Sequence, residues 1–295
     1  MLLLAAAIVS LGPDTLRELA SGLTFARPPA AGLAPSPLHA DPILQSRLDS
    51  LSASVDAGSL GVAVVDLQSG ATAGVDAARA YPAASLFKVP ILLEVLTEEE
   101  AGRLDPERRL EITPEDWTDG SGVLQARVGD RLPVRELAQL MIQESDNIAA
   151  LVLLDVVGVS SVNSLAERLG MPATRLVDHR AGEAGDHTTS AADMAHLLVG
   201  LATGQLVSAH VAEQALSLLE LKQSVTWLGD DLPFWVKVAH KWGDLPYARH
   251  DAGIVYTPRG SYAIAVLTEN SPPDESARAI ARASRLTYDY LATTH

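Results

Sequence analysis

The sequence contains no cysteine among its 295 residues. This absence excludes disulfide bonds, catalysis by a thiolate and metal sites with cysteine ligands. The eight histidines are scattered along the chain and show no spacing typical of metal ligands. We therefore expect neither a metal nor another cofactor.

Basic residues are also scarce, because 22 lysines and arginines stand against 37 aspartates and glutamates, for a net charge of −15. A surface of this sign repels nucleic-acid phosphates, so we expect no nucleic-acid partner. Past residue 40, no apolar run is long enough to cross a bilayer, and we expect no stable membrane span. An apolar content of 47% is ample for a core of one two-lobed unit or two small domains, and we expect a monomer.

The N-terminal region allows two interpretations. Residues 1–11 are almost wholly apolar and precede Gly12 and Pro13, like the apolar region of a secretory signal, although no lysine or arginine comes before them. The alternative is a short buried or frayed N-terminal segment. Residues 27–42 are rich in proline and alanine, as linkers are. Residues 1–40 are therefore interpreted as a possible signal segment and linker, and the expected location is periplasmic or secreted.

The first part of the remaining chain predicts a helix and a strand pair. Asp41 and Pro42 suit the start of a helix that runs to about residue 55. Residues 61–67 are typical of a strand, and residues 71–75 of its hairpin partner. Helical patterns follow over residues 84–96, 134–144, 147–157, 162–169, 191–203 and 211–221.

Strand patterns return near the C-terminus, over residues 235–240, 252–257 and 262–268. A final helix is predicted from Pro272 to about residue 291. Strands at both ends with helices between them predict a sheet-plus-helices lobe and an all-helical lobe. Active sites commonly lie between such lobes.

Ser85 and Lys88 form the first of three short segments that carry chemistry. A serine hydroxyl needs a base within hydrogen-bond reach to act as a nucleophile. Residues three apart on a helix share one face, so Lys88 can reach Ser85. A desolvated lysine near other cations can lose its proton and serve as that base. Taken alone, the spacing also fits a capping serine beside a solvated lysine.

Ser145, Asp146 and Asn147 form the second segment, at the junction of two predicted helices. A second serine can relay a proton to a leaving group. An asparagine amide offers both a donor and an acceptor to a bound substrate. The alternative is helix capping, for which all three residue types are suited, and Asp146 is consistent with a purely structural role.

The third segment is Lys241, Trp242 and Gly243, at the end of a predicted strand. Lys241 can supply a fixed positive charge to a substrate carboxylate. Gly243 lets the strand backbone approach a ligand closely. The backbone N–H of Asp244 can pair with that of Ser85 as an oxyanion hole. The alternative is an exposed strand end followed by a turn.

The three segments occur in the order S-x-x-K, S-D-N and K-x-G, each on the expected type of element. This set resembles the class A β-lactamases and penicillin-binding proteins. Residues 188–195 are similar to the start of the helix after that family's omega loop. Other similar segments are residues 120–125, 134–137, 147–150 and 251–256. The resemblance covers nearly all of residues 41–291.

The resemblance implies an α+β fold, in which a five-stranded antiparallel sheet is flanked by terminal helices and carries an inserted all-helical domain. Residues 41–88 and 225–295 would form the sheet lobe, and residues 89–224 the helical lobe. The active site would lie between them.

The resemblance also implies a mechanism. Ser85 would attack a carbonyl, Lys88 would take its proton, and Ser145 would pass a proton to the departing nitrogen. The N–H groups of Ser85 and Asp244 would hold the oxyanion. The residues expected to bind the substrate are Asn147, Lys241, Trp242, Gly243 and Asp244.

The segment that corresponds to the omega loop departs from the family. Residues 174–188 are shorter than that loop and lack its motif of a glutamate and an asparagine that position the hydrolytic water. Glu183 is the nearest candidate for the general base, with Asp178 and His179 behind it. The alternative is a solvated loop glutamate, in which case water would attack an acyl-enzyme slowly.

Trp242 is the second departure, because the family usually has a threonine or serine whose hydroxyl binds the substrate carboxylate. Strand geometry allows the indole to point into the cleft or away from it. Arg249 could replace the lost anion contact, with a surface role as the alternative. His240 is predicted to pack or to form a hydrogen bond, not to act as a base.

Three functions remain open from the sequence. The first is a serine hydrolase that opens a β-lactam or a related amide or ester through an acyl-enzyme. The second is a D,D-peptidase or other penicillin-binding protein that acts on cell-wall peptides and deacylates slowly. The third is a non-catalytic binding or sensor domain on the same fold. The expected partner is a small-molecule β-lactam or a cell-wall peptide.

Overall fold

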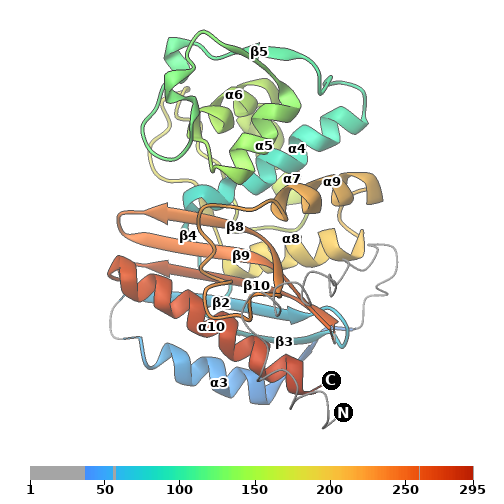
Figure 1. Cartoon of the computed structure of the whole chain (residues 1–295), viewed down its shortest axis with the longest axis vertical. Helices are drawn as coiled ribbons and strands as arrows, with labels where there is room; N and C mark the ends of the chain where they lie inside the picture. Colours follow the sequence, from blue (N-terminus) through green and yellow to red (C-terminus); the bar gives the residue numbers. More distant parts are fainter. Residues whose placement is uncertain (1–36, 56–57, 259, 295) are drawn as a thin grey trace, which may run out of the picture.

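The computed structural model describes residues 37–55, 58–258 and 260–294. Apart from residues 37–40, the predicted signal segment and linker lie outside this range. The described residues form a lobe built on a central sheet and a helical lobe stacked on it (Figure 1).

The central sheet has the strand order β1-β3-β2-β10-β9-β8. Five of these strands pair in antiparallel fashion, which confirms the predicted five-stranded sheet: β2 (Ser59–Asp66), β3 (Ala71–Val75), β8 (Lys237–Leu245), β9 (Ala248–Thr257) and β10 (Gly260–Glu269). The two-residue β1 (His39–Ala40) adds a parallel sixth strand that the sequence did not predict. Strand β8 runs five residues past the predicted end of its strand at residue 240, so it carries Lys241 and Gly243 within it.

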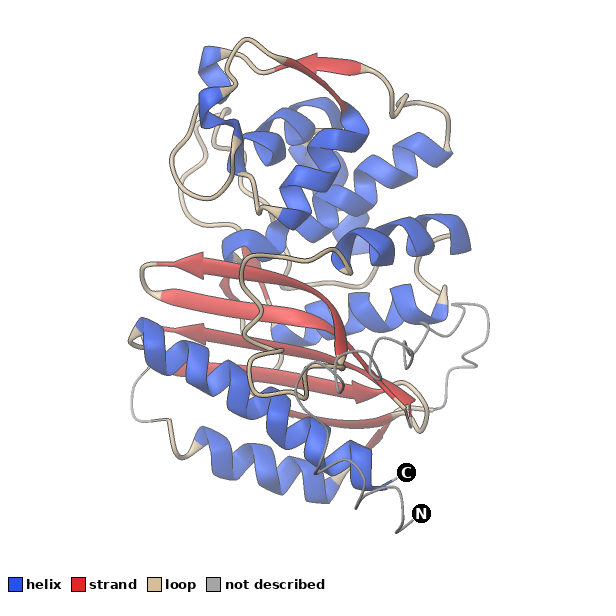
Figure 2. Cartoon of the chain, viewed as in Figure 1, coloured by secondary structure: helices blue, strands red, loops and turns tan. Residues whose placement is uncertain are grey.

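Helices cover both faces of the sheet (Figure 2). Strand alternation places Ile264 of β10 toward α3 (Pro42–Ser52) and α10 (Pro273–Thr294), and places Ala263 and Ala265 toward α8 (Ala191–Thr203). The two faces therefore belong to two hydrophobic clusters, one shared with the terminal helices and one continuous with the helical lobe.

The helical lobe is built around α4 (Lys88–Glu100), which is buried over most of its length. A helix that is apolar on all sides suits the centre of a bundle. Around it pack α5 (Val134–Gln143), α6 (Asn147–Val157), α7 (Val159–Arg168) and α9 (Ala209–Leu219). Short elements complete the structure: β4 (Tyr81–Pro82), η2 (Ala84–Phe87), β5 (Arg109–Glu111), η3 (Pro114–Asp116), η4 (Leu124–Ala126), β6 (Arg131–Pro133) and β7 (Thr188–Thr189).

The two predicted lobes are visible, but one helix crosses the predicted division. Helix α8 lies inside residues 89–224 and packs on the sheet through β2, β9 and β10. The predicted domain boundaries at residues 88 and 225 therefore stay a prediction. The contacts of α8 place this helix with the sheet lobe.

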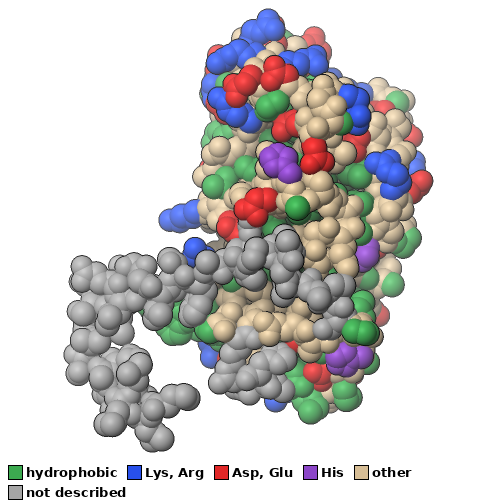
Figure 3. Space-filling view, turned by 90° about the vertical axis from the view of Figure 1, so that its right-hand side faces the viewer, with side chains coloured by type: hydrophobic (Ala, Val, Ile, Leu, Met, Phe, Trp, Pro, Cys, Tyr) green, Lys and Arg blue, Asp and Glu red, His purple; other side chains and the backbone are tan. Residues whose placement is uncertain are grey.

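The outer end of the helical lobe carries arginine side chains among acidic ones (top of Figure 3). Arg135 pairs with Glu107 there, and Arg131 lies 3.6 Å from Glu111. In the described part of the chain, no single helix is long and apolar enough to cross a membrane. Helices α6 and α7 meet the requirement only when taken together, and they bend by 83° where they join.

Candidate active site

Ser85 lies in the short helix η2, between strand β4 and helix α4, and is 9% exposed. The residue before it, Ala84, has a φ of +44°, a conformation that costs a non-glycine residue energy. Such strain persists where the surroundings fix the backbone, often at functional sites. Since η2 runs directly into α4, Lys88 follows one turn later on the same side as Ser85.

Lys88 is fully buried, and its amine lies at the centre of the site. The Nζ atom is 3.1 Å from Ser85 Oγ and 2.7 Å from Asn147 Oδ1, and it also donates to the Ser145 carbonyl oxygen. Burial lowers the pKa of Lys88 to about 7, although Asp146 opposes the shift. A neutral amine has two N–H groups for these two carbonyl oxygens and one lone pair, which leaves the lone pair for the Ser85 hydroxyl proton.

Ser145 connects the two lysines of the site. Its Oγ lies 3.2 Å from Lys88 Nζ and 3.0 Å from Lys241 Nζ. The residue is fully buried and has a φ of +53°, so its backbone is held in an unfavourable conformation at the junction of α5 and α6. A hydroxyl that both donates and accepts can pass a proton between such neighbours.

Asp146 has the structural role that the sequence allowed. One carboxylate oxygen accepts from Ala149 N and caps α6, while the other accepts from Val123 N and Leu124 N. Asn147 then presents its amide, whose Nδ2 donates to Asp119 O at 3.0 Å. Asp146 thereby ties the loop that faces Ser85 to the helix that carries Asn147.

Lys241 and Gly243 reach the site from β8. Lys241 is fully buried and donates to Trp242 O at 2.8 Å, and burial together with Lys88 lowers its pKa well below the usual range. A Cβ atom on Gly243 would lie 2.9 Å from both Ser85 N and Ala84 Cβ. Only glycine therefore allows β8 to approach Ser85 this closely. The oxyanion hole formed by the N–H groups of Ser85 and Asp244 stays a prediction, and the close approach of β8 to Ser85 is consistent with it.

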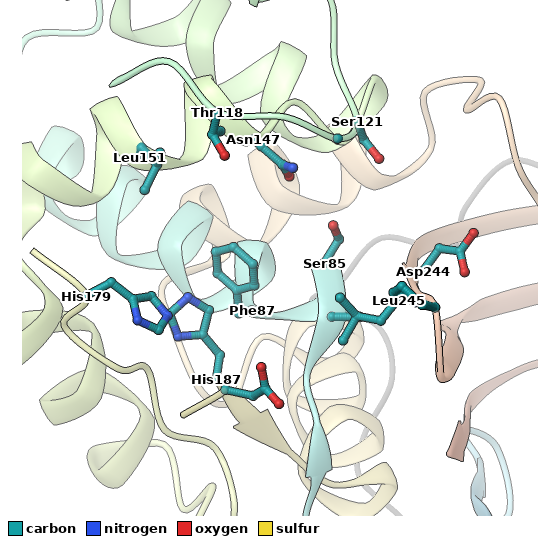
Figure 4. Close-up of a pocket in the computed structure, with 14 residues that line it drawn as sticks. Ser85, Phe87, Thr118, Ser121, Asn147, Leu151, His179, His187, Asp244 and Leu245 are labelled. Atoms are coloured by element: carbon teal, nitrogen blue, oxygen red, sulfur yellow. The ribbon is translucent and has the colours of Figure 1, made fainter. Parts of the chain in front are cut away.

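A pocket of about 410 Å³ opens beside Ser85. In Figure 4 the Ser85 hydroxyl points toward the side of the pocket that carries Asn147 and Ser121, with Phe87 and His187 on one flank and Asp244 on the other. The lining residues are Ala84, Ser85, Phe87, Thr118, Gly120, Ser121, Asn147, Leu151, His179, Asp186, His187, Asp244, Leu245 and Pro246.

Trp242 is not among the described residues that line this pocket, so the geometry gives no support to its prediction as a substrate-binding residue. The indole is 6% exposed and packs edge-on against Trp227, at 6.1 Å between ring centroids, in the cluster beneath α10. The alternation of β8 places Lys241 toward Ser145 and the next side chain, Trp242, toward the opposite face. The ring still covers the Lys241 amine, with Nζ 4.6 Å from its centroid.

Arg249 and His240 are occupied by contacts within the protein. Arg249 donates to Asp244 Oδ1 at 3.0 Å and to Pro273 O at 2.6 Å, which agrees with a surface role. His240 Nδ1 lies 2.8 Å from Asp251 Oδ1, both buried, as predicted for a hydrogen-bonding residue.

Glu183 is also absent from the pocket lining, so the geometry does not support its prediction as the general base. Its carboxylate accepts from Asp178 N at 3.1 Å, lies 3.6 Å from an Arg175 nitrogen and is 46% exposed. The loop of residues 174–188 folds onto itself through the backbone pairing of Arg175 with Thr188, and this turns Glu183 toward its own loop.

Two histidines of this loop line the pocket instead. The His187 ring packs against the Phe87 ring, with 4.3 Å between the ring centroids, and His187 Nδ1 accepts a hydrogen bond from Val177 N at 2.9 Å. Burial, and next the neighbouring His179, lower the pKa of His187 to about 4. The ring is therefore neutral at pH 7, with its proton on Nε2, and this nitrogen has no lone pair to accept a proton from water.

Sequence reasoning missed His187 and Asp186 and named His179 only as a secondary candidate. The sequence signal that could have identified His187 as a pocket residue was its position directly before the short strand Thr188–Thr189. Within the residues that the structure describes, no group of three or more histidine, aspartate or glutamate side chains could hold a metal ion.

Comparison with known proteins agrees with this geometry. The model of the beta-lactamase enzyme family matches residues 43–291. The solved structure of PBP-A is 26% identical, with a TM-score of 0.81 over 88% of this chain and 99% of that chain. A beta-lactamase from Sphaerobacter thermophilus DSM 20745 is 26% identical, with a TM-score of 0.77 over 85% of this chain and 98% of that chain.

An ancestral class A beta-lactamase, GNCA, is 28% identical, with a TM-score of 0.77 over 84% of this chain and 99% of that chain. These matches confirm the α+β fold and the resemblance seen in the three motifs. Since the family model spans most of its residues, the chain belongs to the beta-lactamase enzyme family.

Proposed function

We propose that Ser85 is acylated by a β-lactam or a related amide or ester, and that this serine hydrolase releases the acyl group slowly. The observation that carries the proposal is the buried amine of Lys88, 3.1 Å from Ser85 Oγ, in a pocket open to a small ligand. A structure of a PBP-A mutant, 27% identical to this chain, holds an acyl-enzyme complex with penicillin-G. That complex supports a β-lactam as the acyl donor.

The acylation step follows from the contacts of the site. Ser85 Oγ attacks the carbonyl carbon while neutral Lys88 takes its proton. When the carbon–nitrogen bond breaks, Ser145 Oγ gives its proton to the departing nitrogen and is reprotonated from the adjoining lysine amines. Backbone N–H groups of Ser85 and Asp244 would stabilise the oxyanion. The product is an ester of Ser85.

Slow deacylation rests on the geometry of the loop of residues 174–188. Hydrolysis of the ester requires a base that holds a water against the acyl carbon. Glu183 lies outside the pocket, and the tautomer of His187 presents an N–H rather than a lone pair. This arrangement supports a penicillin-binding protein more than an efficient class A β-lactamase.

A periplasmic or secreted location is part of the proposal. Its support is the apolar stretch of residues 1–11 and the linker-like stretch of residues 27–42. Cell-wall peptides and β-lactams are met in that location. Mass determination of the mature N-terminus would test it, and an intact Met1 in the secreted fraction would contradict cleavage.

Intact-protein mass spectrometry over time, with a penicillin, a cephalosporin and a simple ester, tests the activity. We expect a long-lived adduct that Ser85→Ala abolishes. Ser121→Ala is the matched control, because Ser121 lines the same pocket and is not among the described hydrogen-bond partners of Lys88. Accumulating product with a short-lived adduct would overturn slow deacylation. No adduct with any probe would favour a non-catalytic binding domain.

A further inference from the structure

The charged side chains of the pocket wall are acidic. Among the described residues that line the pocket, Asp186 and Asp244 carry charge, and there is no lysine or arginine. Lys88 and Lys241 lie behind the wall, fully buried, and their amines are engaged by Ser145 and by carbonyl oxygens. A ligand in the pocket therefore meets carboxylates before it meets an amine.

The two carboxylates are compensated to different degrees. Asp244 faces Arg249 directly across the β8–β9 register and accepts from its Nε at 3.0 Å, so its charge is partly offset. Asp186 accepts at 2.9 Å from Tyr247 Oη, a neutral donor. Among the residues that the structure describes, no arginine or lysine forms an ion pair with Asp186. One negative charge thus remains at this side of the pocket.

The position of Asp186 close to the nucleophile is fixed by its neighbours. The carbonyl of His187 accepts from Ala83 N at 2.6 Å, two residues before Ser85. Tyr247 stands in the turn between β8 and β9, next to Leu245 and Pro246 of the pocket wall. Asp186 is therefore held between the Ser85 segment and the end of β8, where the acyl group of a bound substrate can reach it.

We propose that this pocket selects substrates whose acyl group carries a protonated amine over substrates whose acyl group carries a carboxylate, with the amine against Asp186. The proposal rests on the acylation of Ser85 described above and adds the charge of the preferred substrate. A cleft lined by one sign of charge raises the local concentration of ligands of the opposite sign. The net charge of −15 acts in the same direction at long range.

A matched series of p-nitrophenyl benzoates tests the proposal, with an aminomethyl, a hydroxymethyl or a carboxyl group in the para position. In each, the Ser85 Oγ–carbon bond forms, nitrophenolate leaves and the hydroxyl proton passes to Lys88. Acylation rates are divided by the hydroxide hydrolysis rate of the same ester. We expect the aminomethyl ester to react roughly fivefold or more faster than the carboxyl ester, less so at high salt.

Asp186→Asn supplies the decisive variant, because its amide oxygen can still accept from Tyr247 while the charge is removed. We expect the ratio of the aminomethyl rate to the carboxyl rate to fall most of the way to one in this variant. Asp49→Asn is the matched control: it makes the same charge change on α3, where Asp49 accepts from Gln45. An unchanged preference in Asp186→Asn, or fastest reaction of the carboxyl ester, would overturn the proposal.

Binding to Ser85→Ala separates this proposal from the proposed function. Calorimetric titration of that variant with the corresponding p-substituted benzamides measures affinity without chemistry. In one outcome, no ester acylates Ser85, the aminomethyl amide binds best to Ser85→Ala, and it loses this advantage in a Ser85→Ala, Asp186→Asn double variant. The charge proposal then stands and the proposed function fails. Equal affinities for the aminomethyl and carboxyl amides would refute the charge proposal alone.

Discussion

The two sides of the pocket are held by different kinds of interaction. On one side, Ser85, Lys88, Ser145 and Lys241 share a buried network of hydrogen bonds from three segments of the chain. On the other side, the loop of residues 174–188 is largely exposed over residues 179–186. The first side holds the buried amines next to Ser85, whereas the second side presents His179, His187 and the carboxylate of Asp186 and leaves Glu183 outside the pocket lining.

The anchors of the loop explain this difference. Arg180 pairs with Asp116 at 2.6 Å and with Asp155 at 2.7 Å, and Arg175 pairs its backbone with Thr188. The contacts of Arg180 fix the loop to the helical lobe, and the pairing of Arg175 with Thr188 joins the two ends of the loop. Because Glu183 is directed at its own loop, the loop borders the pocket without placing this carboxylate where it could bind a hydrolytic water. Under the proposed function, acylation of Ser85 and hydrolysis of the ester therefore depend on separate parts of this fold.

Lys88→Arg should have the largest effect, because a guanidinium stays protonated and cannot accept the Ser85 proton. We expect the acylation rate to fall by roughly 10² to 10⁴. The rate of adduct formation by mass spectrometry is the measurement, with thermal unfolding to verify the fold. Lys88→Met should give a similar loss. A Lys88→Arg variant with more than about a tenth of the original rate would show that another group acts as the base.

The pH dependence of acylation tests whether neutral Lys88 is the base on the buried side of the pocket. Burial lowers the pKa of Lys88 to about 7, so the amine is mostly protonated, and inactive as a base, below that pH. We expect the acylation rate to fall by roughly tenfold per pH unit below 7 and to level off above it. His187, with a pKa of about 4, stays neutral through this range. A rate independent of pH between 5 and 7 would be inconsistent with neutral Lys88 as the base.

Ser145→Ala should have a smaller effect that depends on the leaving group. The hydroxyl lies between two lysine amines and is placed to protonate a departing nitrogen. We expect acylation by a β-lactam to slow by roughly a hundredfold and acylation by a nitrophenyl ester by less than about tenfold, since nitrophenolate leaves without a proton. Stopped-flow rates with both probes provide the measurement. Equal losses would assign Ser145 a structural role only.

Glu183→Gln should have the smallest effect, and it tests whether the loop of residues 174–188 takes part in hydrolysis of the acyl-enzyme. The glutamine can still accept from Asp178 N, so the loop should keep its conformation. We expect the lifetime of the acyl-enzyme to change by less than about twofold, because Glu183 does not reach the pocket. The decay of the adduct mass after removal of excess ligand measures it. A lifetime more than about ten times longer would restore Glu183 as the general base.

The buried side of the site was predictable in two ways. The spacing of Ser85 and Lys88 along one helical turn defines their contact locally. The contacts of Ser145 and Asn147 with Lys88 join distant parts of the chain, and only the resemblance of the three motifs to a known family led us to expect them. Gly243 was identified as a place where the strand backbone can approach a ligand closely. The structure shows a close approach to Ser85, since an added Cβ would lie 2.9 Å from Ser85 N, and the approach to a ligand stays a prediction.

The remaining residues depend on contacts that the local sequence does not contain. Trp242 could face either side of its strand, and only the pairing of β8 with β9 and the position of Trp227 decide it. His187 lines the pocket because its ring meets Phe87 and its carbonyl meets Ala83, each far away in the chain.

Long, periodic elements of the fold were predicted well, and short ones were missed. Helices α6 and α8 and strand β3 have the predicted bounds. The two- and three-residue strands β1, β4, β5, β6 and β7 were not predicted, since so few residues show no periodicity.

The pairing of β2 with β10 sets the order in which this protein can be assembled. Val64 lies opposite Ile264 in the register, so the centre of the sheet closes only after almost the whole chain has been synthesised. Closing so long a loop costs entropy before any contact repays it, which makes such pairing slow compared with helix packing. The helical lobe, made of consecutive segments, can form while the C-terminal strands are still absent. Lys241 arrives with those strands, so a nascent or truncated chain lacks a complete proton path at Ser85.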